Sequence, residues 1–431
     1  MSRKNLEFKC FYNEKIRIFS EELLESNRKQ GFSRNLKMFY GYTSPDSVHF
    51  HQWFWDSCFH AIVLSQFDPS FAIRELNTLF SVQEEDGFVP HIILWKWRIV
   101  DLLKPWWYRE VKSKSLFYTA EIQPPVAGMS LGYIYNRLRN KEVLESLVDS
   151  VYRFYIYLSK HRDPDNDGLI SIITPLESGM DMLPIYDNVL GNPDHDPMYQ
   201  KRLIRQMLTF YKSIDWNLER VFEAQVFDVE DVAFNTIYVL GLKELSRVLR
   251  RYDRARSEEI SSLARRVERA IINKMWDSDD GIFYSLMSRG NKEVMLRIKT
   301  VSSLFPLLLD IPEYMVSSLV SYIKSKRHFW SEWPIPSVSM DERSFGPLTE
   351  TRFLWRGTTW INTNWFIWQG LRKSGEIHLA NELVKRTWGL IEKYGFCEFY
   401  DPFKGFPGGA MRDFGWSTLG SLMFVEELSN L

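Results

Sequence analysis

The sequence predicts a mostly helical protein built from paired helices, and three of its features support this prediction. Long segments repeat apolar residues at the spacing of one helix face, whereas the strict alternation typical of half-buried strands is scarce. Turns that carry an acidic cluster and then a glycine separate several of these segments. No Ser/Gly-rich or charge-rich linker divides the 431 residues. Helical hairpins that close into a ring would give the whole chain one architecture.

The helical segments follow one another along most of the chain. Residues 231–252 place Phe234, Ile237 and Leu245 at helical spacing, with Asp231 as the expected N-cap. The same pattern predicts helices over residues 14–28, 58–82, 142–160, 199–222, 257–276, 312–325 and 376–393.

The recurring turns carry glycine after acidic residues, at 83–92, 163–172, 276–285 and 392–401. Glycine suits the left-handed position of such turns, and Asp stabilises them through its side chain. The turn at 163–168 also matches the first half of an EF-hand loop. Thr174 stands where that loop needs a bidentate Glu, so we expect no calcium there.

The composition is that of an ordinary folded protein. It is 45% hydrophobic and 25% charged, and 54 basic and 55 acidic residues give a net charge of −1. This balance provides no general attraction for nucleic acid or anionic membranes. We therefore expect neither of them as a partner.

Cysteine content and the first residues favour the cytoplasm. Cys10, Cys58 and Cys397 are odd in number and lack CxxC spacing, which argues against a disulfide framework or a structural zinc site. The first 15 residues scatter charges and contain no apolar core of a secretory signal. No apolar run approaches the roughly 18 residues of a membrane span. A reducing cytoplasm is the expected location.

Aromatic content is high, at 15% with 16 Trp. Many of the tryptophans fall in loop-like stretches, at 51–57, 93–97 and 104–108. Buried indoles need a partner for their N–H, so clusters at turns indicate a concave, half-polar lining. Sugar rings suit such linings, because their C–H faces stack on indole while their hydroxyls need hydrogen bonds.

Two carboxylate-bearing turns stand out. Residues 174–184 hold Glu177 and Asp181 among Pro175, Gly179 and Pro184, which disfavour a helix interior. The second turn holds Glu398 among aromatic residues. Two carboxylates that meet in an aromatic cleft are what glycoside hydrolysis requires, although any helical protein has acidic turns.

Several segments between residues 40 and 420 occur in the order of a known family. They are "WFWDSCFHAIVL" (53–64), "EDGFVPHI" (85–92), "QPPV" (123–126), "PLESGMD" (175–181), "IPSVSMDERSF" (335–345) with "LWRGTTWINTNWFIWQGL" (354–371), and "CEFYDPFKG" (397–405) with "FGWSTL" (414–419). The chain thus resembles glycoside hydrolase family 63, in particular its short members that act on mannosylglycerate or glucosylglycerate. Each match alone is weak, and their common order makes the resemblance specific.

The resemblance implies an all-α (α/α)6 barrel, with residues 1–431 as one catalytic domain. It also implies an inverting mechanism, in which Asp181 matches the general acid and Glu398 the general base. On this pattern the chemistry requires no metal and no organic cofactor. Asp56 would bind hydroxyls of the cleaved sugar.

Nine further residues match positions that would line the sugar pocket. They are Trp53, Trp55, Gln123, Glu177, Arg356, Trp360, Asn364, Trp365 and Trp416. Structural alternatives stay open for several candidates: Trp53 and Trp55 as core residues, Asp56 as an N-cap, Arg356 as the partner of an inner-ring carboxylate, and Glu177 as an orienting group. We expect His91 to be a hydrogen-bonded residue outside catalysis.

The chain departs from the family pattern beside the expected acid. Leu176 stands where the family usually has Trp, and Met182 and Leu183 stand where it often has Asn and Ser. These more apolar neighbours would tune the acid or reshape the pocket. The chain is also too short for the N-terminal β-rich domain of the family's larger members, which favours a small glycoside as substrate.

The first functional hypothesis is an inverting α-glycosidase for a small glucoside or mannoside, such as mannosylglycerate or glucosylglycerate. Arg356, Lys404 or Arg412 could pair with an acidic aglycone. The alternatives are a trehalase-like or oligosaccharide α-glucosidase, a sugar epimerase, and a carbohydrate-binding protein without catalysis. Residues 327–352 are long, irregular and contain proline, so we predict a mobile flap there. The sequence does not determine the sugar, the aglycone or the oligomeric state.

Overall fold

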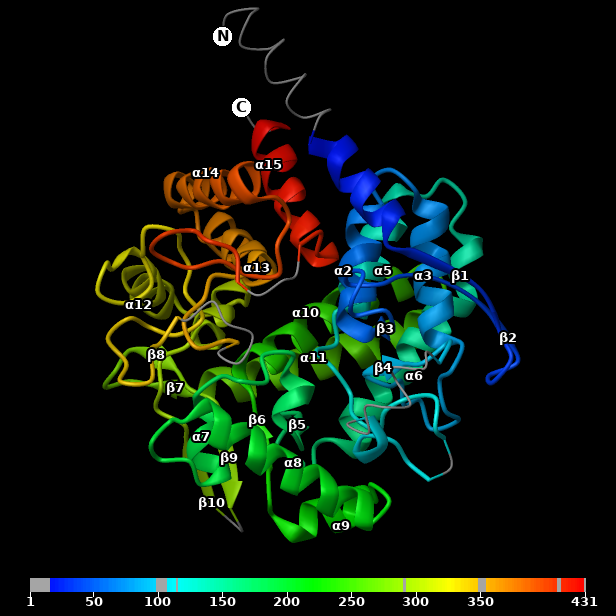
Figure 1. Ribbon diagram of the computed structural model, residues 1–431, viewed down its shortest axis with the longest axis horizontal. Coiled ribbons are helices and arrows are strands. Elements are labelled where there is room, and N and C mark those ends of the chain that lie inside the picture. Colours follow the sequence, from blue (N-terminus) through cyan, green and yellow to red (C-terminus); the bar gives the residue numbers. More distant parts are fainter. Residues whose placement is uncertain are drawn as a thin grey trace, which may run out of the picture.

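Two layers of helices make up most of the protein, and the inner layer closes into a ring (Figure 1). The structure is a computed structural model that describes residues 16–97, 107–113, 115–289, 292–347, 354–408 and 412–429. The inner elements of this part are α2 (Phe54–Leu64), α5 (Ala127–Arg137), α10 (Val232–Leu249), the 3-10 helix η4 (Val301–Leu308), α13 (Ile361–Lys373) and α15 (Leu419–Ser429). Each contacts the next, and α15 contacts α2. The predicted (α/α)6 barrel is confirmed.

The outer helices pack on the inner ring with one apolar face. They are α3 (Pro69–Phe80), α6 (Glu145–His161, after the 3-10 turn η2, Glu142–Leu144), α11 (Arg254–Lys274), α12 (Glu313–Lys324) and α14 (Ile377–Tyr394). In α11, Ile260, Val267 and Ile271 are buried against α10, whereas Arg254 and Glu258 are exposed. This contrast is the amphipathic pattern that the sequence contains.

In the described part of the chain the helix predictions are confirmed except at two breaks and at the end of segment 14–28, where β1 begins at Arg28; residues 14 and 15 lie outside the described part. The segment 58–82 contains most of α2, which ends at Leu64, and all of α3, which Asp68 caps by accepting a hydrogen bond from the Phe71 N–H (3.0 Å). The segment 199–222 covers parts of α8 (Pro197–Ser213) and α9 (Leu218–Ala224), which are separated by four residues, two of which, Asp215 and Trp216, have positive φ. Both breaks come from local capping or turn chemistry that apolar periodicity does not report.

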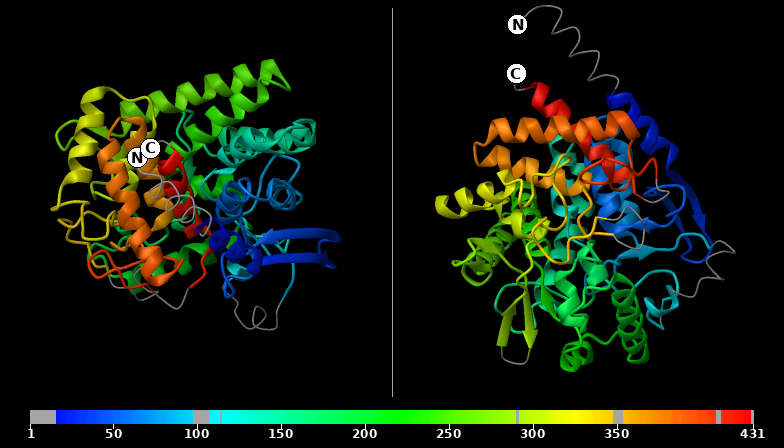
Figure 2. Two further views of the ribbon diagram at one scale, coloured as in Figure 1. Left: turned by 90° about the horizontal axis from the view of Figure 1, so that it is seen from above. Right: turned by 60° about the vertical axis from the view of Figure 1, so that its left-hand side comes forward.

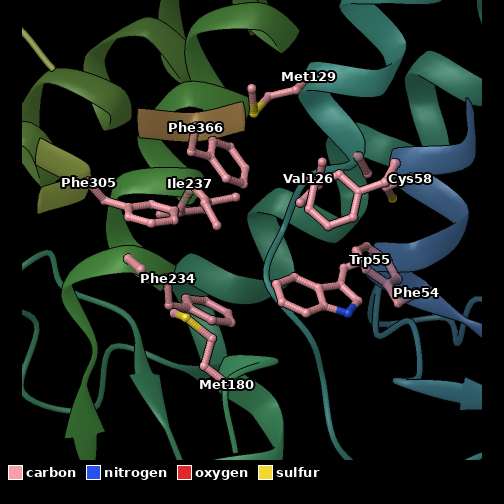
Figure 3. Close-up of a cluster of buried hydrophobic side chains, with 14 of the residues drawn as sticks. Phe54, Trp55, Cys58, Val126, Met129, Met180, Phe234, Ile237, Phe305 and Phe366 are labelled. Atoms are coloured by element: carbon pink, nitrogen blue, oxygen red, sulfur yellow. The ribbon is translucent and has the colours of Figure 1, made fainter. Parts of the chain in front are cut away.

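The barrel interior is filled by side chains from successive inner helices, as Figure 3 shows. Phe54, Met129, Ile237, Phe305 and Phe366 come from α2, α5, α10, η4 and α13 respectively, and all five are buried. As predicted, Asp231 caps α10, accepting a hydrogen bond from the Phe234 N–H (2.9 Å). The hydrophobic core therefore lies on the axis of the ring and supports the loops at the ends of the inner helices.

Short antiparallel strands tie the inter-helix loops together. They are β1 (Arg28–Ser33), β2 (Met38–Thr43), β3 (Gln52–Trp53), β4 (Ile92–Ile93), β5 (Ser171–Ile172), β6 (Val229–Glu230), β7 (Trp276–Asp277), β8 (Ile282–Phe283), β9 (Leu286–Arg289) and β10 (Lys292–Met295). The order β10-β9-β6-β5 forms one four-stranded sheet. The β1–β2 hairpin projects from one side of the molecule (Figure 2, left). The β3–β4 pair joins the start of α2 to the loop that carries His91.

The glycines of the predicted acidic turns adopt the expected conformation. Gly87, Gly168, Gly281 and Gly395 have φ values of 103°, 105°, 65° and 82°. Positive φ of this size is readily available only to glycine. The prediction of left-handed turns between the helices is confirmed.

The prediction of a mobile flap is wrong for residues 327–347, and residues 348–352 lie outside the described part of the chain. Backbone N–H groups of Trp333, Ser337 and Ser339 donate to Pro402, Thr358 and Lys299 at 2.8–2.9 Å. Phe329, Ile335 and Val338 are buried. The segment is irregular because its hydrogen bonds go to distant loops instead of to a neighbouring turn.

Candidate active site

A pocket of about 270 Å³ lies where several inner helices begin. Its described lining residues are Pro45, His49, Trp53, Trp55, Asp56, His91, Ile92, Glu110, Gln123, Leu176, Gly179, Asp181, Leu354, Trp355, Glu398, Phe414 and Trp416. The volume lies just below the roughly 300–1,000 Å³ of ligand pockets, so the pocket suits a small ligand. Seven of the twelve residues predicted for the site line it: Trp53, Trp55, Asp56, Gln123, Asp181, Glu398 and Trp416.

Asp181 reaches the pocket from the loop after the 3-10 turn η3 (Pro175–Ser178). Gly179 shapes this loop: its φ is +69°, and a Cβ there would lie 2.6 Å from the Trp55 ring. Burial raises the pKa of Asp181 to about 6, although the nearby Lys201 charge acts in the opposite direction. A carboxyl with such a pKa can hold a proton close to neutral pH.

The apolar residues after Asp181 do not face the pocket. Met182 and Leu183 are buried in the core, whereas Leu176, before the acid, is a lining residue. Of the departures from the family pattern, the one at Leu176 therefore alters the pocket surface directly.

Glu398 enters the pocket from the segment between α14 and the 3-10 turn η6 (Gly415–Thr418). Its backbone carbonyl accepts a hydrogen bond from the Trp416 indole N–H (3.4 Å). Burial raises the pKa of Glu398 to about 7; the charge of His49 lowers it, and those of Asp46 and Asp181 raise it. Asp181 and Glu398, 217 residues apart in the sequence, thus share one pocket and influence each other electrostatically.

The first turn of α2 supplies Asp56, which is 2% exposed. Burial raises the pKa of Asp56 to about 8, opposed by the charge of His49 and reinforced by Glu398. The Gln123 side chain accepts a hydrogen bond from the Trp55 N–H (3.0 Å) and so fixes the start of α2. Because one Asp56 oxygen has no hydrogen-bond partner among the described residues, it is available to a ligand.

Aromatic rings form much of the pocket wall. Trp55 and Trp416 meet edge to face at 5.4 Å, and Trp53 lies edge to face with His91 at 5.0 Å. Trp355 stacks at 3.6 Å on Trp360, which lies behind it. The wall therefore offers flat apolar surfaces between the four carboxyl groups of Asp56, Glu110, Asp181 and Glu398.

Five predicted lining residues have other surroundings. Trp360 supports Trp355, and Trp365 packs in the core with Phe366 (4.9 Å). Asn364 donates to the Pro334 carbonyl and accepts from the Ile335 N–H. The other two, Glu177 and Arg356, form buried ion pairs. None of the five is a lining residue of the pocket, because their side chains are used in packing and in buried hydrogen bonds.

The ion pairs replace the expected sugar contacts of Glu177 and Arg356. Glu177 accepts two hydrogen bonds from Arg162, at 2.9 and 2.7 Å. Arg356 donates to both oxygens of Asp187, which lies in α7 (Ile185–Leu190), at 2.6 and 2.8 Å. For Glu177 this geometry agrees with the structural alternative of an orienting group. Arg356 has a structural ion pair, as its alternative proposed, but the partner carboxylate lies in α7 and not in the inner ring. Lys404 and Arg412, the other expected partners of an acidic aglycone, are exposed and are not lining residues.

We expect Arg356→Met to destabilise the protein by about 3–5 kcal/mol, because it leaves the Asp187 carboxylate buried without its cation. Urea unfolding measures this loss. The double variant Arg356→Met/Asp187→Leu removes the unpaired charge and should recover part of the stability. A variant of normal stability whose only defect is a raised KM would instead make Arg356 a substrate ligand.

Sequence reasoning missed His49, Glu110 and Trp355, and it excluded His91. His49 Nδ1 lies 3.0 Å from Asp46, whose hydrogen bond and charge, with Glu398 and Asp56, outweigh burial and raise the pKa of His49. His49 lies four residues before Trp53, which is the only signal that could have found it. His91 is not the satisfied residue that we expected: its Nδ1 has no hydrogen-bond partner among the described residues.

None of the described helices combines the length and apolar character needed to cross a bilayer. The model of the mannosylglycerate hydrolase MGH1-like glycoside hydrolase domain matches residues 49–417. This match covers most of the chain and includes every described lining residue except Pro45.

Two curated relatives and one solved structure agree with this match. A mannosylglycerate hydrolase of Thermus thermophilus is 28% identical over 94% of this chain and 99% of its own length. A glucosylglycerate hydrolase of Mycolicibacterium hassiacum is 25% identical over 88% and 93%. The crystal structure of a family 63 mannosylglycerate hydrolase, also from Thermus thermophilus and in complex with Tris and D-glycerate, superposes with a TM-score of 0.82 at 26% identity, covering 95% of this chain and all of that one. The chain therefore belongs to the family of the mannosylglycerate hydrolase MGH1-like domain and is a glycoside hydrolase.

Proposed function

We propose that this glycoside hydrolase cleaves a small α-mannoside or α-glucoside of glycerate with inversion, using Asp181 as general acid and Glu398 as general base. The observation that carries the proposal is that these two carboxyl groups, from distant parts of the chain, line one aromatic pocket. Asp181 would protonate the leaving oxygen, and Glu398 would take a proton from the attacking water. The relatives named for mannosylglycerate and glucosylglycerate support the choice of aglycone.

The pocket wall would hold the sugar by stacking and by hydrogen bonds. Trp53, Trp55 and Trp416 offer apolar faces for the C–H side of the ring. Asp56 would bind hydroxyls of the cleaved ring, as either acceptor or donor according to its protonation. Gln123 would act beside it, while its side-chain oxygen holds the start of α2.

A trehalase-like activity on a neutral disaccharide is the second candidate, and the charges of the pocket favour it. The described lining residues include four carboxyl groups and neither Lys nor Arg. Among the described lining residues only His49, whose pKa is raised, can offer a positive charge to a glycerate carboxylate. Trehalose therefore belongs among the test substrates.

The proposal is tested by rates on mannosylglycerate, glucosylglycerate, trehalose, maltose and methyl α-mannoside. The expected result is the highest kcat/KM on one of the two glycerate glycosides. Preference for trehalose by tenfold or more would replace the glycerate assignment with the second candidate. Inactivity on every α-glycoside tested, with the protein folded, would contradict the proposed hydrolysis.

We expect kcat/KM to follow a bell-shaped pH profile with its maximum between about pH 6 and 7, the pKa values of Asp181 and Glu398. Asp181 must hold its proton, so activity falls as pH rises above both pKa values. Glu398 must lose its proton, so activity falls as pH drops below both of them. Because the base has the higher pKa, molecules with Asp181 protonated and Glu398 deprotonated are a minority at every pH.

The variant His49→Gln tests whether Glu398 is the base that titrates in this pH profile. The charge of His49 lowers the pKa of Glu398, so its removal should raise that pKa. The maximum should then move to higher pH and become lower. A maximum that stays in place, or moves to lower pH, would show that Glu398 is not the titrating base.

Two further proposals concern the whole chain. We propose that residues 1–431 act as one catalytic domain, which is supported by the shared core of the inner helices. We also propose a cytoplasmic location, which is supported by the free, buried state of Cys58 and Cys397.

A further inference from the structure

Three buried side chains meet in the pocket wall beside the proposed acid. One ligand atom each of His91, Glu110 and Glu121 lies within 4.8 Å of the other two. These residues are 4%, 6% and 0% exposed. His91 and Glu110 also line the pocket, so the cluster touches the space where the substrate would bind. The proposed hydrolysis leaves all three without a role.

The backbone fixes this cluster from several directions. The His91 N–H donates to the Glu121 carbonyl (2.8 Å), and the Ala120 N–H donates to the Glu110 carbonyl (2.6 Å). The His91 carbonyl in turn accepts from the Phe54 N–H at the start of α2 (2.9 Å). These bonds join three loops at one place, so the arrangement of the three side chains does not depend on a mobile segment.

Three polar atoms of the cluster lack partners among the described residues. Both carboxylate oxygens of Glu121 and Nδ1 of His91 are buried without a hydrogen bond. A buried polar group without a partner destabilises the folded protein, and a charged one does so more strongly. The positive charge of Arg162 acts on Glu121. The Arg162 guanidinium, however, already donates hydrogen bonds to both carboxylate oxygens of Glu177.

The geometry points to a binding site for one divalent transition-metal ion, such as Zn²⁺, held by His91, Glu110 and Glu121. One imidazole and two carboxylates form a ligand set that suits zinc and its neighbours in the first transition series. Three protein ligands leave a fourth position open, and two of these ligands face the pocket. The ion would thus present its open position to the substrate space. Acid–base hydrolysis by Asp181 and Glu398 needs no step at this ion.

A second acidic cluster provides a contrast and a control. Ligand atoms of Asp165, Asp167, Glu230 and Glu293 also lie within 4.8 Å of one another. There the Lys274 ammonium pairs with Asp167 and Glu293, so a cation of the protein already occupies the cluster. Glu230 is buried with both oxygens unpaired, as Glu121 is, but it does not line the pocket. Glu230→Gln therefore matches Glu121→Gln in chemistry and burial.

The test measures metal binding to the full chain after treatment with a chelator. Calorimetry measures the binding of Zn²⁺, and visible absorption measures the binding of Co²⁺. We expect the wild type and Glu230→Gln to bind one equivalent and to give Co²⁺ d–d bands. Glu121→Gln should weaken binding by more than the roughly 10–100-fold typical of changes around a metal's ligands. This readout does not depend on glycosidase activity, so it stands or fails separately from the proposed function.

Three results would overturn the inference. They are absence of binding by the wild type at millimolar metal, unchanged binding by folded Glu121→Gln, and loss of binding in Glu230→Gln alone. If Glu121→Gln does not fold, X-ray absorption of the Zn²⁺-loaded wild type decides instead. One imidazole nitrogen among oxygen ligands supports the site, and a shell without imidazole contradicts it.

Discussion

Asp181→Asn lowers kcat/KM for an α-glycoside with an alkoxide leaving group by about 10²–10⁴-fold, the range typical of a lost general acid. The amide has nearly the shape of the carboxyl group but cannot donate the proton that the leaving oxygen needs. The half-buried surroundings of Asp181, which raise its pKa to about 6, keep that proton available in the wild type. Initial rates with the best substrate of the panel measure the loss.

A leaving group that needs no proton distinguishes acid catalysis from general damage to the pocket. Fluoride departs from an α-glycosyl fluoride without general-acid help, so Asp181→Asn should retain most of its activity on that substrate. Glu230→Gln, outside the pocket, should behave as the wild type with both substrates. Equal losses of Asp181→Asn on the glycoside and the fluoride would rule out its role as proton donor.

Glu398→Gln is expected to lose about 10²–10⁴-fold in kcat/KM on both kinds of substrate. Activation of water is required whichever group leaves, so the loss should not depend on the leaving group. This pattern, opposite to that of Asp181→Asn, separates the two carboxyl groups by role. Comparison of the glycoside and the fluoride for the two variants provides the measurement. If Glu398→Gln were selectively rescued by fluoride as a leaving group, the two assignments would have to be exchanged.

The outer helices could be predicted from the sequence and most inner helices could not, for one physical reason. An outer helix such as α11 has a buried and an exposed face, so its apolar residues recur every three to four positions. In α13, ten of the thirteen residues are buried. A helix that is buried all round lacks this contrast between faces, and periodicity cannot reveal it. The fold prediction therefore depended on the outer layer and on the resemblance.

The residues of the site, too, could be predicted only in part from the sequence. Motifs place Trp360, Asn364 and Trp365 on one segment with Arg356, but they do not say which side chains face the pocket. Since α13 begins at Ile361, this segment turns into the ring, and its polar groups satisfy buried neighbours. His49 and Glu110 reach the pocket from other loops. The position of these loops at the pocket depends on tertiary pairings such as β3–β4, and no spacing rule predicts such pairings from the sequence.

Proton NMR of the sugar first released by the wild-type protein tests the central claim most directly. If Asp181 and Glu398 act as an inverting pair, an α-linked substrate must give the β-anomer first, before mutarotation mixes the two forms. The spectrum should therefore show the β-anomeric proton signal rising ahead of the α signal. Initial release of the α-anomer would contradict the inverting mechanism and the roles assigned to both carboxyl groups.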